Sequence, residues 1–488
     1  MKELLIKYYR PIIWSLLIFQ LILFAINIPG LYIDIDEPWF GEQAHYLAED
    51  GFVKSEMFQD FLRYDERILV YHKVFIWIGA FSIKFFGLSL FCLRLISLLF
   101  GILLTGLLYH FCKRYYNITI FKITLVVLLF CPLIFRNAIL YRPEIMICAT
   151  GFMSFFFLYI FIQNNNKLYL ILSAVIAGFS LLIHLNGIIF IGAGAALLLY
   201  KKRWTHFGIF SAIAALVASF YFYETIGNFE LFGMQFMNDP SNAGGNAQWS
   251  MPFTNLLDEH KRLFRKPEII GITILFLLSA FYWIKNKPTD RKHLLIYTFC
   301  LIILMGAINH NKTTKYAILL FPYFALMIAE YIYMLINDSA KQKSLIHKLF
   351  LIILSFTILF GSYTTIKLTI FGKENWGEIH RAVASHIPKD SKLLAPMKFM
   401  FNEIGNYEIV GFLPAKIILD TRDKDFNAEN ACLIGLENDV DYIIIDNRYK
   451  KEFGCALDDI TCLENDYFKY ITSEYEYDIY KRDSLLTE

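Results

Sequence analysis

The chain is poor in charged residues, and it lacks the cysteine pairs of small metal-binding domains. Only 18% of its 488 residues are charged and 57% are hydrophobic, whereas ordinary soluble domains have roughly 25% charged residues. The formal net charge is only +2, which leaves no overall field for nucleic acid. Eight cysteines occur without paired Cys-x-x-Cys spacing, which excludes a zinc finger. Internal repeats and low-complexity tracts are also missing.

The first apolar run lacks the small-residue cleavage site of a removed signal peptide. It follows a basic start and extends from Pro11 to Ile28. We therefore expect a retained first membrane span.

Long apolar runs recur as far as residue 370, and an ordinary soluble core could not bury them all. Spans of 17–25 residues suit a bilayer, and we identify eleven runs: about 11–29, 92–111, 118–136, 144–162, 168–185, 187–200, 204–223, 267–284, 293–309, 316–336 and 346–368. The short pair 168–185 and 187–200 could be divided differently. The predicted fold is therefore mainly α, a polytopic helix bundle over residues 1–370.

Lysine and arginine in the short loops predict the orientation of the chain. Lys113 and Arg114, and Lys201 to Arg203, lie on one side if the N-terminus is cytoplasmic, as the positive-inside rule requires. The long loops 30–91 and 224–266 then lie outside and would form the site. We expect an inner (plasma) membrane protein with its C-terminal part extracytoplasmic.

Residues 371–488 have the pattern of a small soluble α/β domain. Trp376 to His386 is predicted as a helix, and short strands are predicted at 392–396, 407–411, 416–419 and 442–446. Cys455 and Cys462 are close enough in sequence to form a disulfide in an oxidising compartment.

Three acids follow the first span closely. Asp34, Asp36 and Glu37 precede a predicted amphipathic helix that starts near Pro38 and ends at Gly51. One interpretation is helix capping, because a carboxylate there satisfies free N–H groups. The other is a general base, whose pKa rises when burial disfavours the charged form.

Four places in the sequence resemble the protein O-mannosyltransferase and aminoarabinose-transferase superfamily, which has the GT-C membrane fold. They are Asp36-Glu37, the block Trp77–Gly87 followed by Arg94, the segment Tyr141-Arg142-Pro143-Glu144, and Lys315-Tyr316 before Phe321-Pro322. The resemblance covers residues 10–370. Two departures are the absence of proline around Lys73 and the longer acid Glu144, where relatives have aspartate.

This resemblance implies a glycosyltransferase that moves a sugar from a polyprenyl-phosphate carrier to a protein, lipid or glycan acceptor, with inversion. Asp36 is the candidate base, with Glu37 and Glu144 as supporting or substrate-orienting acids. The donor phosphate needs cationic or dipolar partners, and the candidates are Lys73, Arg142, Arg262, Arg265, Lys312, Lys315 and Tyr316.

Each basic candidate also has a structural explanation. Arg142 could simply pair with Glu144, Arg262 and Arg265 could anchor the next span, and Lys312 and Lys315 could end a helix. His184 and Asn186 suit an ordinary turn. No cofactor is expected, because metal-ligand spacing is missing, although a divalent cation bridging Asp36 and the phosphate stays open.

Two other classes of protein compete with this interpretation. A transporter or flippase of a lipid-linked sugar should carry ionisable residues near the middle of its spans, whereas here the charges gather at one face. A structural or assembly protein would leave the acidic loop unexplained. The expected partners are the lipid-linked donor, the acceptor and the bilayer, and no nucleic acid.

Overall fold

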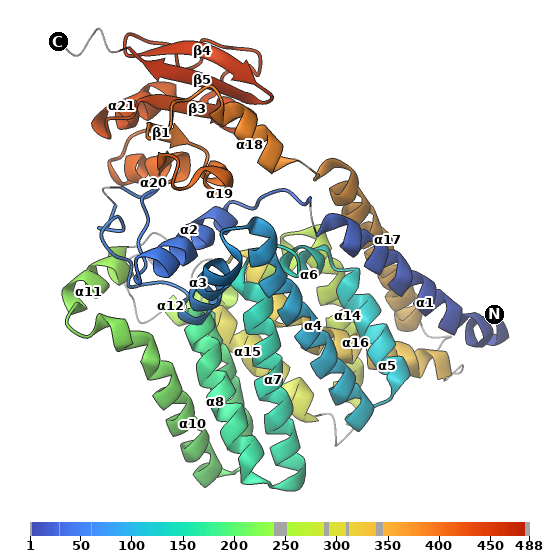
Figure 1. Ribbon diagram of the computed structural model, residues 1–488. Helices are drawn as coiled ribbons and strands as arrows, with labels where there is room; N and C mark the ends of the chain where they lie inside the picture. The colour runs from blue at the N-terminus through green and yellow to red at the C-terminus, as the bar shows by residue number, and fades with distance from the viewer. Residues whose placement is uncertain are drawn as a thin grey trace.

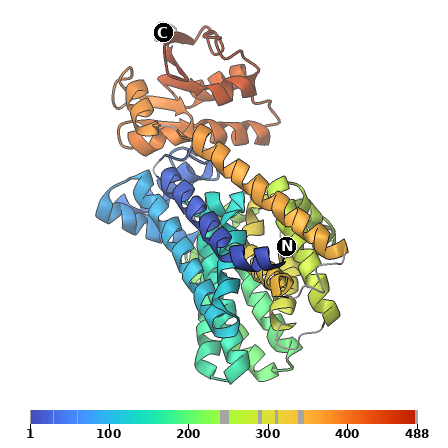
Figure 2. The same cartoon turned by 90° about the vertical axis from the view of Figure 1, so that its right-hand side faces the viewer.

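The computed structural model describes residues 2–28, 30–59, 61–238, 251–286, 292–308, 312–337, 345–373 and 375–483. A helical bundle carries a smaller α/β unit at one end, drawn in orange and red above it in Figure 1. Figure 2 shows α17 (Leu345–Phe371) leading from the bundle to that unit.

The bundle is built from apolar helices. The longer ones are α1 (Lys2–Asn27), α4 (Leu90–Tyr115), α5 (Ile118–Leu129), α7 (Pro143–Asn164), α8 (Lys167–Ile183), α9 (Ile188–Tyr200), α10 (Trp204–Ser219), α14 (Pro267–Asn286), α15 (Lys292–Ile308), α16 (Phe321–Asn337) and α17. Within the described residues, five helices are long and apolar enough to cross a membrane. The chain is a multi-pass membrane protein, and the span count of eleven stays a prediction.

Helix α7 lies at the centre of the bundle. Of its most apolar stretch, 89% is buried, against 17% for α17. Phe356 and Leu359 of α17 are largely exposed. Apolar side chains on the outside of a bundle are favourable only where lipid covers them.

One predicted run is divided by proline. Residues 118–136 form α5 and the separate short helix α6 (Pro132–Asn137), with Pro132 in the first turn of α6. Proline has no N–H to continue the preceding helix, but it suits a helix start. The runs 168–185 and 187–200 are indeed two helices, α8 and α9, joined by the turn η1 (Leu185–Gly187).

Short helices cover one end of the bundle. They are α2 (Asp36–Glu49), α3 (Lys73–Phe86), η2 (Phe220–Thr225), α11 (Phe229–Asn238), α12 (Met251–Leu257), α13 (Glu259–Phe264) and η4 (Thr314–Leu319). Figure 1 shows α2 and α3 beneath the α/β unit. Phe81, Phe85 and Phe86 of α3 are exposed, so we expect this helix to contact the lipid–water boundary.

The α/β unit contains a five-stranded sheet in the order β2-β1-β3-β5-β4. The strands are β1 (Lys392–Ala395), β2 (Glu408–Gly411), β3 (Tyr442–Asp446), β4 (Phe468–Glu474) and β5 (Tyr477–Arg482). Strand β1 is parallel to β2 and β3, and β5 is antiparallel to β3 and β4. The connecting helices are α18 (Trp376–Ala384), η6 (Met397–Phe399), α19 (Met400–Glu403), α20 (Phe412–Thr421), α21 (Ala428–Glu437) and α22 (Asn447–Phe453).

The strand predicted at residues 416–419 is wrong, because these residues lie within α20. Pro414, Ala415, Ile418 and Leu419 are buried together, and their spacing is that of one helical face. A four-residue apolar run cannot by itself distinguish a strand from a buried helical turn. Cys455 and Cys462 form a disulfide.

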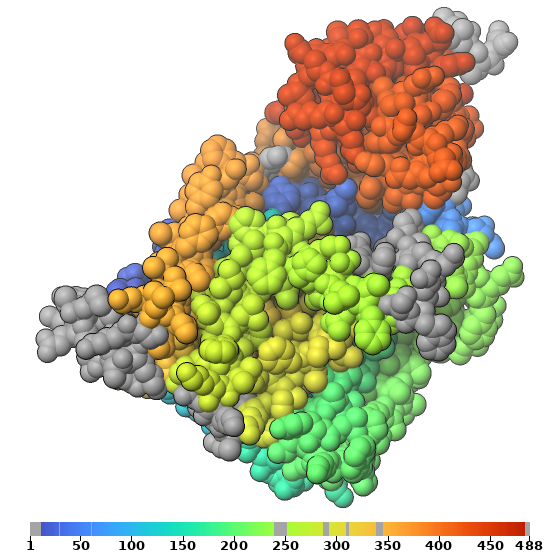
Figure 3. All heavy atoms as spheres, turned by 180° about the vertical axis from the view of Figure 1, so that it is seen from behind, coloured from blue at the N-terminus to red at the C-terminus, as the bar shows by residue number. Residues whose placement is uncertain are grey.

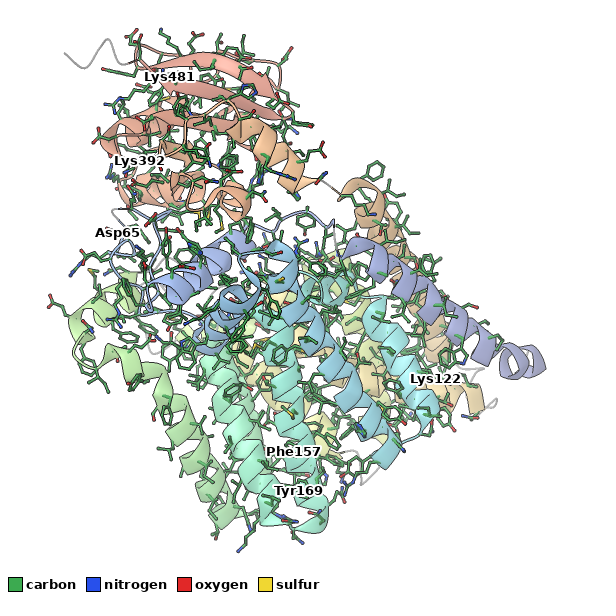
Figure 4. All side chains as sticks on the ribbon, viewed as in Figure 1. Asp65, Lys122, Phe157, Tyr169, Lys392 and Lys481 are labelled. Carbon is green, nitrogen blue, oxygen red and sulfur yellow. A yellow bond between two sulfur atoms is a disulfide. The ribbon has the colours of Figure 1, made fainter. Side chains whose placement is uncertain are left out.

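The α/β unit contacts the segment that follows α1. Gly411 N–H donates to Met57 O at 3.1 Å, and Leu31 forms a backbone bridge with Lys373. Figure 3 shows from behind that the unit covers one end of the bundle only. In Figure 4, Asp65 lies at this covered end, whereas Phe157 and Tyr169 lie at the opposite end.

Candidate functional site

The acids after the first span build the start of α2. Asp34 N–H donates to Glu37 Oε2 at 2.9 Å, and Asp36 N–H donates to Asp34 Oδ1 at 3.2 Å. These bonds fix the turn that leads into α2, although the N-cap residue of the helix, Ile35, has no side-chain cap. They do not use the carboxylate of Asp36, which is left for other contacts.

Glu37 is a fully buried brace between three segments. Arg94 Nε donates to Glu37 Oε1 at 2.8 Å and Arg94 Nη2 donates to Oε2 at 2.7 Å. Tyr141 N–H donates to Oε1 at 2.7 Å, and Arg94 also donates to the carbonyls of Leu31 and Tyr32. Because Glu37 accepts two hydrogen bonds from Arg94 and one from the backbone of Tyr141, it holds α2 against α4 and against the segment before α7.

A cluster of charged side chains, which we call the acid–base cluster, lies beside this brace. It consists of Asp34, Asp36, Arg142, Glu144 and Lys315. Arg142 Nη1 donates to Asp34 Oδ1 at 2.6 Å and also to Asp36, and its Nη2 donates to Glu144 Oε1 at 2.5 Å. Lys315 Nζ donates to Asp36 Oδ2 at 2.9 Å and lies 3.6 Å from Asp34.

The acid–base cluster is closed on one side and open on the other. The side chains of Arg142 and Glu144 are 5% and 2% exposed, whereas those of Asp36 and Lys315 are 32% and 35% exposed. The open side therefore presents one carboxylate and one ammonium group side by side. A ligand phosphate approaching there would meet Lys315 first.

The pKa of Asp36 is lowered by the cluster, whereas the sequence predicted a raised pKa. Burial raises the pKa of this carboxyl, but the charges of Arg142 and Lys315 outweigh burial and lower it to about 2. The sequence indicated a raised pKa, because only the neighbouring apolar span was visible. The cations of Arg142 and Lys315, which come from distant segments, change the direction of the pKa shift.

Two histidines lie against the cluster, and the sequence singled out only one of them. The rings of His72 and His184 stack with centroids 4.3 Å apart, and His184 meets the ring of Tyr316 at 5.2 Å. Burial and the neighbouring His184 hold the pKa of His72 well below its usual value, so its imidazole is neutral. His184 Nδ1 accepts from Asn186 N–H at 3.0 Å, the turn role expected from the sequence.

The structure does not bring Lys73 into the cluster. Its Nζ lies 2.7 Å from Glu224 Oε2 and donates to Leu69 O at 3.0 Å, and it sits over the ring of Tyr71 at 3.7 Å. Glu224 comes from η2, 151 residues away. The neighbouring His72, not Lys73, lies near Asp36.

Two of the other basic candidates, Arg262 and Lys312, pair with a second acid, Glu259. Arg262 Nε lies 2.8 Å from Glu259 Oε1, and Lys312 Nζ lies 3.2 Å from Glu259 Oε2. The guanidinium of Arg262 is 5.9 Å from the ring of Tyr316, so Tyr316 lies between Arg262 and the histidines. Arg265 is exposed at the end of α13.

The residues of the cluster fit a resident metal ion poorly. In the part of the chain that the structure describes, no group of three His, Cys, Asp or Glu is placed to hold one. Asp34 and Asp36 converge, but both already contact Arg142 and Lys315. A divalent cation would have to displace two positive charges from these carboxylates.

With this geometry in place, the chain can be compared with known proteins. Residues 73–223 match the family described as dolichyl-phosphate-mannose-protein mannosyltransferase. No curated protein sequence matches the chain significantly.

Solved structures match over nearly the whole chain. ArnT from Cupriavidus metallidurans bound to undecaprenyl phosphate has a TM-score of 0.62 at 11% identity, covering 97% of this chain and 98% of that one. The Archaeoglobus fulgidus oligosaccharyltransferase in complex with Zn and sulfate gives 0.52 at 11% identity, over 93% and 71%. The archaeal oligosaccharyltransferase AglB from the same organism, with an inhibitory peptide and a dolichol-phosphate, gives 0.50 at 11%, over 99% and 75%.

At 11% identity these matches establish the fold alone, and the family model matches residues 73–223, less than half of the chain. The resemblance to GT-C fold glycosyltransferases of the protein O-mannosyltransferase and aminoarabinose-transferase type, first seen in the sequence, is thereby confirmed.

Proposed function

We propose that the chain is an integral membrane glycosyltransferase. It moves a sugar from a polyprenyl-phosphate-linked donor to an acceptor hydroxyl at the extracytoplasmic face, with inversion at the sugar carbon. The observation that carries the proposal is that Asp36 contacts both Lys315 and Arg142 at the partly open side of the acid–base cluster. The matches to ArnT with undecaprenyl phosphate and AglB with dolichol-phosphate support the class of donor.

The cluster supplies the two charges that this reaction needs. The bond between the sugar carbon and the phosphate oxygen breaks with its electron pair on the phosphate, and Lys315 and Arg142 stabilise that anion. The acceptor oxygen forms the new bond to the same carbon, and its proton passes to Asp36. Atoms and charges balance, because the carboxylate becomes a carboxylic acid as the phosphate is released.

Donor binding prepares Asp36 for this task. A carboxylate with a pKa of about 2 is a weak base. A phosphate that binds Lys315 and Arg142 draws both cations away from Asp36. The pKa of Asp36 then rises toward its ordinary value, so that the base becomes stronger once the donor is in place.

The other candidates take supporting roles in this proposal. Glu144 positions Arg142, and Glu37 positions the start of α2 through Arg94. Tyr316, next to Lys315, lines the donor side together with His184. Lys73, Arg262 and Lys312 pair with acids outside the cluster, and Arg265 is exposed at the end of α13, so we assign none of the four a part in the transfer step.

The central test is Asp36→Asn, with Glu66→Gln as a control that alters an exposed acid of the same loop. The full-length protein is reconstituted with lipid-linked sugar from its native membranes. We expect Asp36→Asn to lose transfer at least a hundredfold while undecaprenyl phosphate still binds, and Glu66→Gln to keep both. Transfer at the wild-type rate in Asp36→Asn would refute the assignment of the base.

A further inference from the structure

A crevice of about 220 Å³ separates the first outer loop from the α/β unit. One wall is Tyr32 to Ile35 with Pro38. The other wall is formed by Trp376, the segment Pro396–Lys398, Asp446, Arg448, Tyr449 and Glu476. Asp34 of the acid–base cluster therefore belongs to one wall.

The crevice lies where an α/β sheet usually binds its ligand. Pro396 follows β1 directly, and Asp446 is the last residue of β3. From β1 the chain goes to β2 on one side and later returns to β3 on the other. The carboxyl ends of β1 and β3 thus form the switch point of the sheet, at which open α/β sheets bind ligands.

Contacts outside the crevice join the α/β unit to residues 41–59 and hold the two walls in place. Gln59 Nε2 donates to Glu408 Oε1 at 2.5 Å, and Gly411 N–H donates to Met57 O. Phe401 packs so closely on Gly41 that an added Cβ would lie 2.8 Å from its ring. A fixed crevice avoids part of the entropic cost of ordering a site on binding.

The charges of the crevice leave one cation available. Lys398 lies 2.9 Å from Asp446 and 3.1 Å from Glu476, and its ammonium sits over Trp376 at 4.2 Å. Arg448 is exposed and, among the described residues, lies within ion-pair distance of no acid. Its guanidinium, 5.5 Å from the ring of Tyr449, therefore keeps its hydrogen-bond donors for a ligand.

A second donor in the crevice lacks an acceptor. The indole N–H of Trp376 is buried and has no hydrogen-bond partner within the described structure. A buried donor without an acceptor costs free energy, so an acceptor oxygen that reached this N–H would gain a hydrogen bond.

We propose that this crevice is the acceptor subsite and that Arg448 binds an acidic group, phosphate or carboxylate, of a hydroxyl-rich acceptor head group. This rests on the proposed function, because only then does Asp34 mark the edge of a reaction centre. The acid group anchored at Arg448 leaves a hydroxyl of the same head group free to approach the cluster. The α/β unit thus selects the acceptor while the helical bundle holds the donor.

The test compares Arg448→Gln with Lys451→Gln, which removes an exposed cation from the same helix outside the crevice. Glucose 6-phosphate, glucuronate and glucose serve as probes for the full-length protein in nanodiscs. Undecaprenyl phosphate is kept saturating, so that the acid–base cluster is occupied. Binding is followed calorimetrically, and melting temperatures verify that both variants are folded.

We expect at least one acidic sugar to bind wild type at least tenfold more tightly than glucose, and the two acidic probes distinguish phosphate from carboxylate. Arg448→Gln should abolish this preference, Lys451→Gln should keep it, and neither should change the Kd of undecaprenyl phosphate. An equal preference in Arg448→Gln, or none in wild type, would overturn the subsite. If undecaprenyl phosphate failed to bind wild type, the proposed function itself would fall.

Discussion

Lys315 donates to the carboxylate of Asp36 across 2.9 Å, although 279 residues separate them along the chain. Asp36 opens α2 and Lys315 lies in η4, just before α16. The pair joins the segment after α1 to the segment before α16. In the proposed reaction it places the proton acceptor beside the cation that holds the leaving phosphate.

Replacing Lys315 should weaken donor binding before it affects anything else. In Lys315→Met the phosphate loses the cation at the open side and keeps only the buried Arg142, and we expect the Kd of undecaprenyl phosphate to rise about tenfold. Lys54→Gln is the matched control, because it removes a partly buried lysine that pairs with Asp50 and Glu56 instead. Unchanged binding in Lys315→Met would remove Lys315 from the phosphate site.

Breaking the buried pair between Glu37 and Arg94 should destabilise the whole layer under the α/β unit. Glu37→Gln leaves the guanidinium of Arg94 uncompensated, at a cost of roughly 3 kcal/mol in the free energy of unfolding. Thermal unfolding in detergent measures this as a lower melting temperature. The double variant Glu37→Gln, Arg94→Met should recover part of the loss, and a further additive loss would argue against pairing as the cause.

Glu42 should make stability depend on pH. Burial raises the pKa of this carboxyl to about 8, against the hydrogen bonds that it accepts from Ser55, Met57 and Glu56. Because the folded pKa exceeds the unfolded value of 4.5, its contribution is complete below pH 4.5 and is lost as pH rises toward 8.

We therefore expect the melting temperature of wild type to fall between pH 5.5 and pH 8.5 relative to that of Glu42→Gln. The glutamine keeps the shape of the side chain and does not titrate. Glu49→Gln, at the end of the same helix, should follow wild type. Parallel curves for wild type and Glu42→Gln would show that Glu42 does not titrate in this range.

The disulfide offers a test of the orientation proposed for the tail. Cys455 and Cys462 are bonded, and the other six cysteines are free. If the tail lies in an oxidising compartment, denatured protein from cells should bind six maleimide groups without reductant and eight after reduction. A Cys455→Ser, Cys462→Ser variant should bind six in both. Eight groups without reductant would contradict the proposed orientation.

Local patterns in the sequence predicted much of the fold. The apolar runs match helices of the bundle because a span in lipid must satisfy its own backbone hydrogen bonds. Strands at β1, β2 and β3 were expected where they occur. The strands β4 (FKYITSE) and β5 (YDIYKR) were missed, since charged and hydroxyl residues divide their apolar residues into runs too short to stand out.

The sequence by itself determined which side chains could serve the site, because Asp36, Arg142, Glu144 and Lys315 all lie beside apolar runs whose ends can be read directly. Tertiary structure alone decided which of them meet. It pairs Lys73 with Glu224 and Glu37 with Arg94. It also places the cations of Arg142 and Lys315 beside the carboxylate of Asp36. The physical reason is distance: an ion pair forms only when its charged atoms lie within about 4 Å, and here those atoms come from residues 57 to 279 positions apart along the chain.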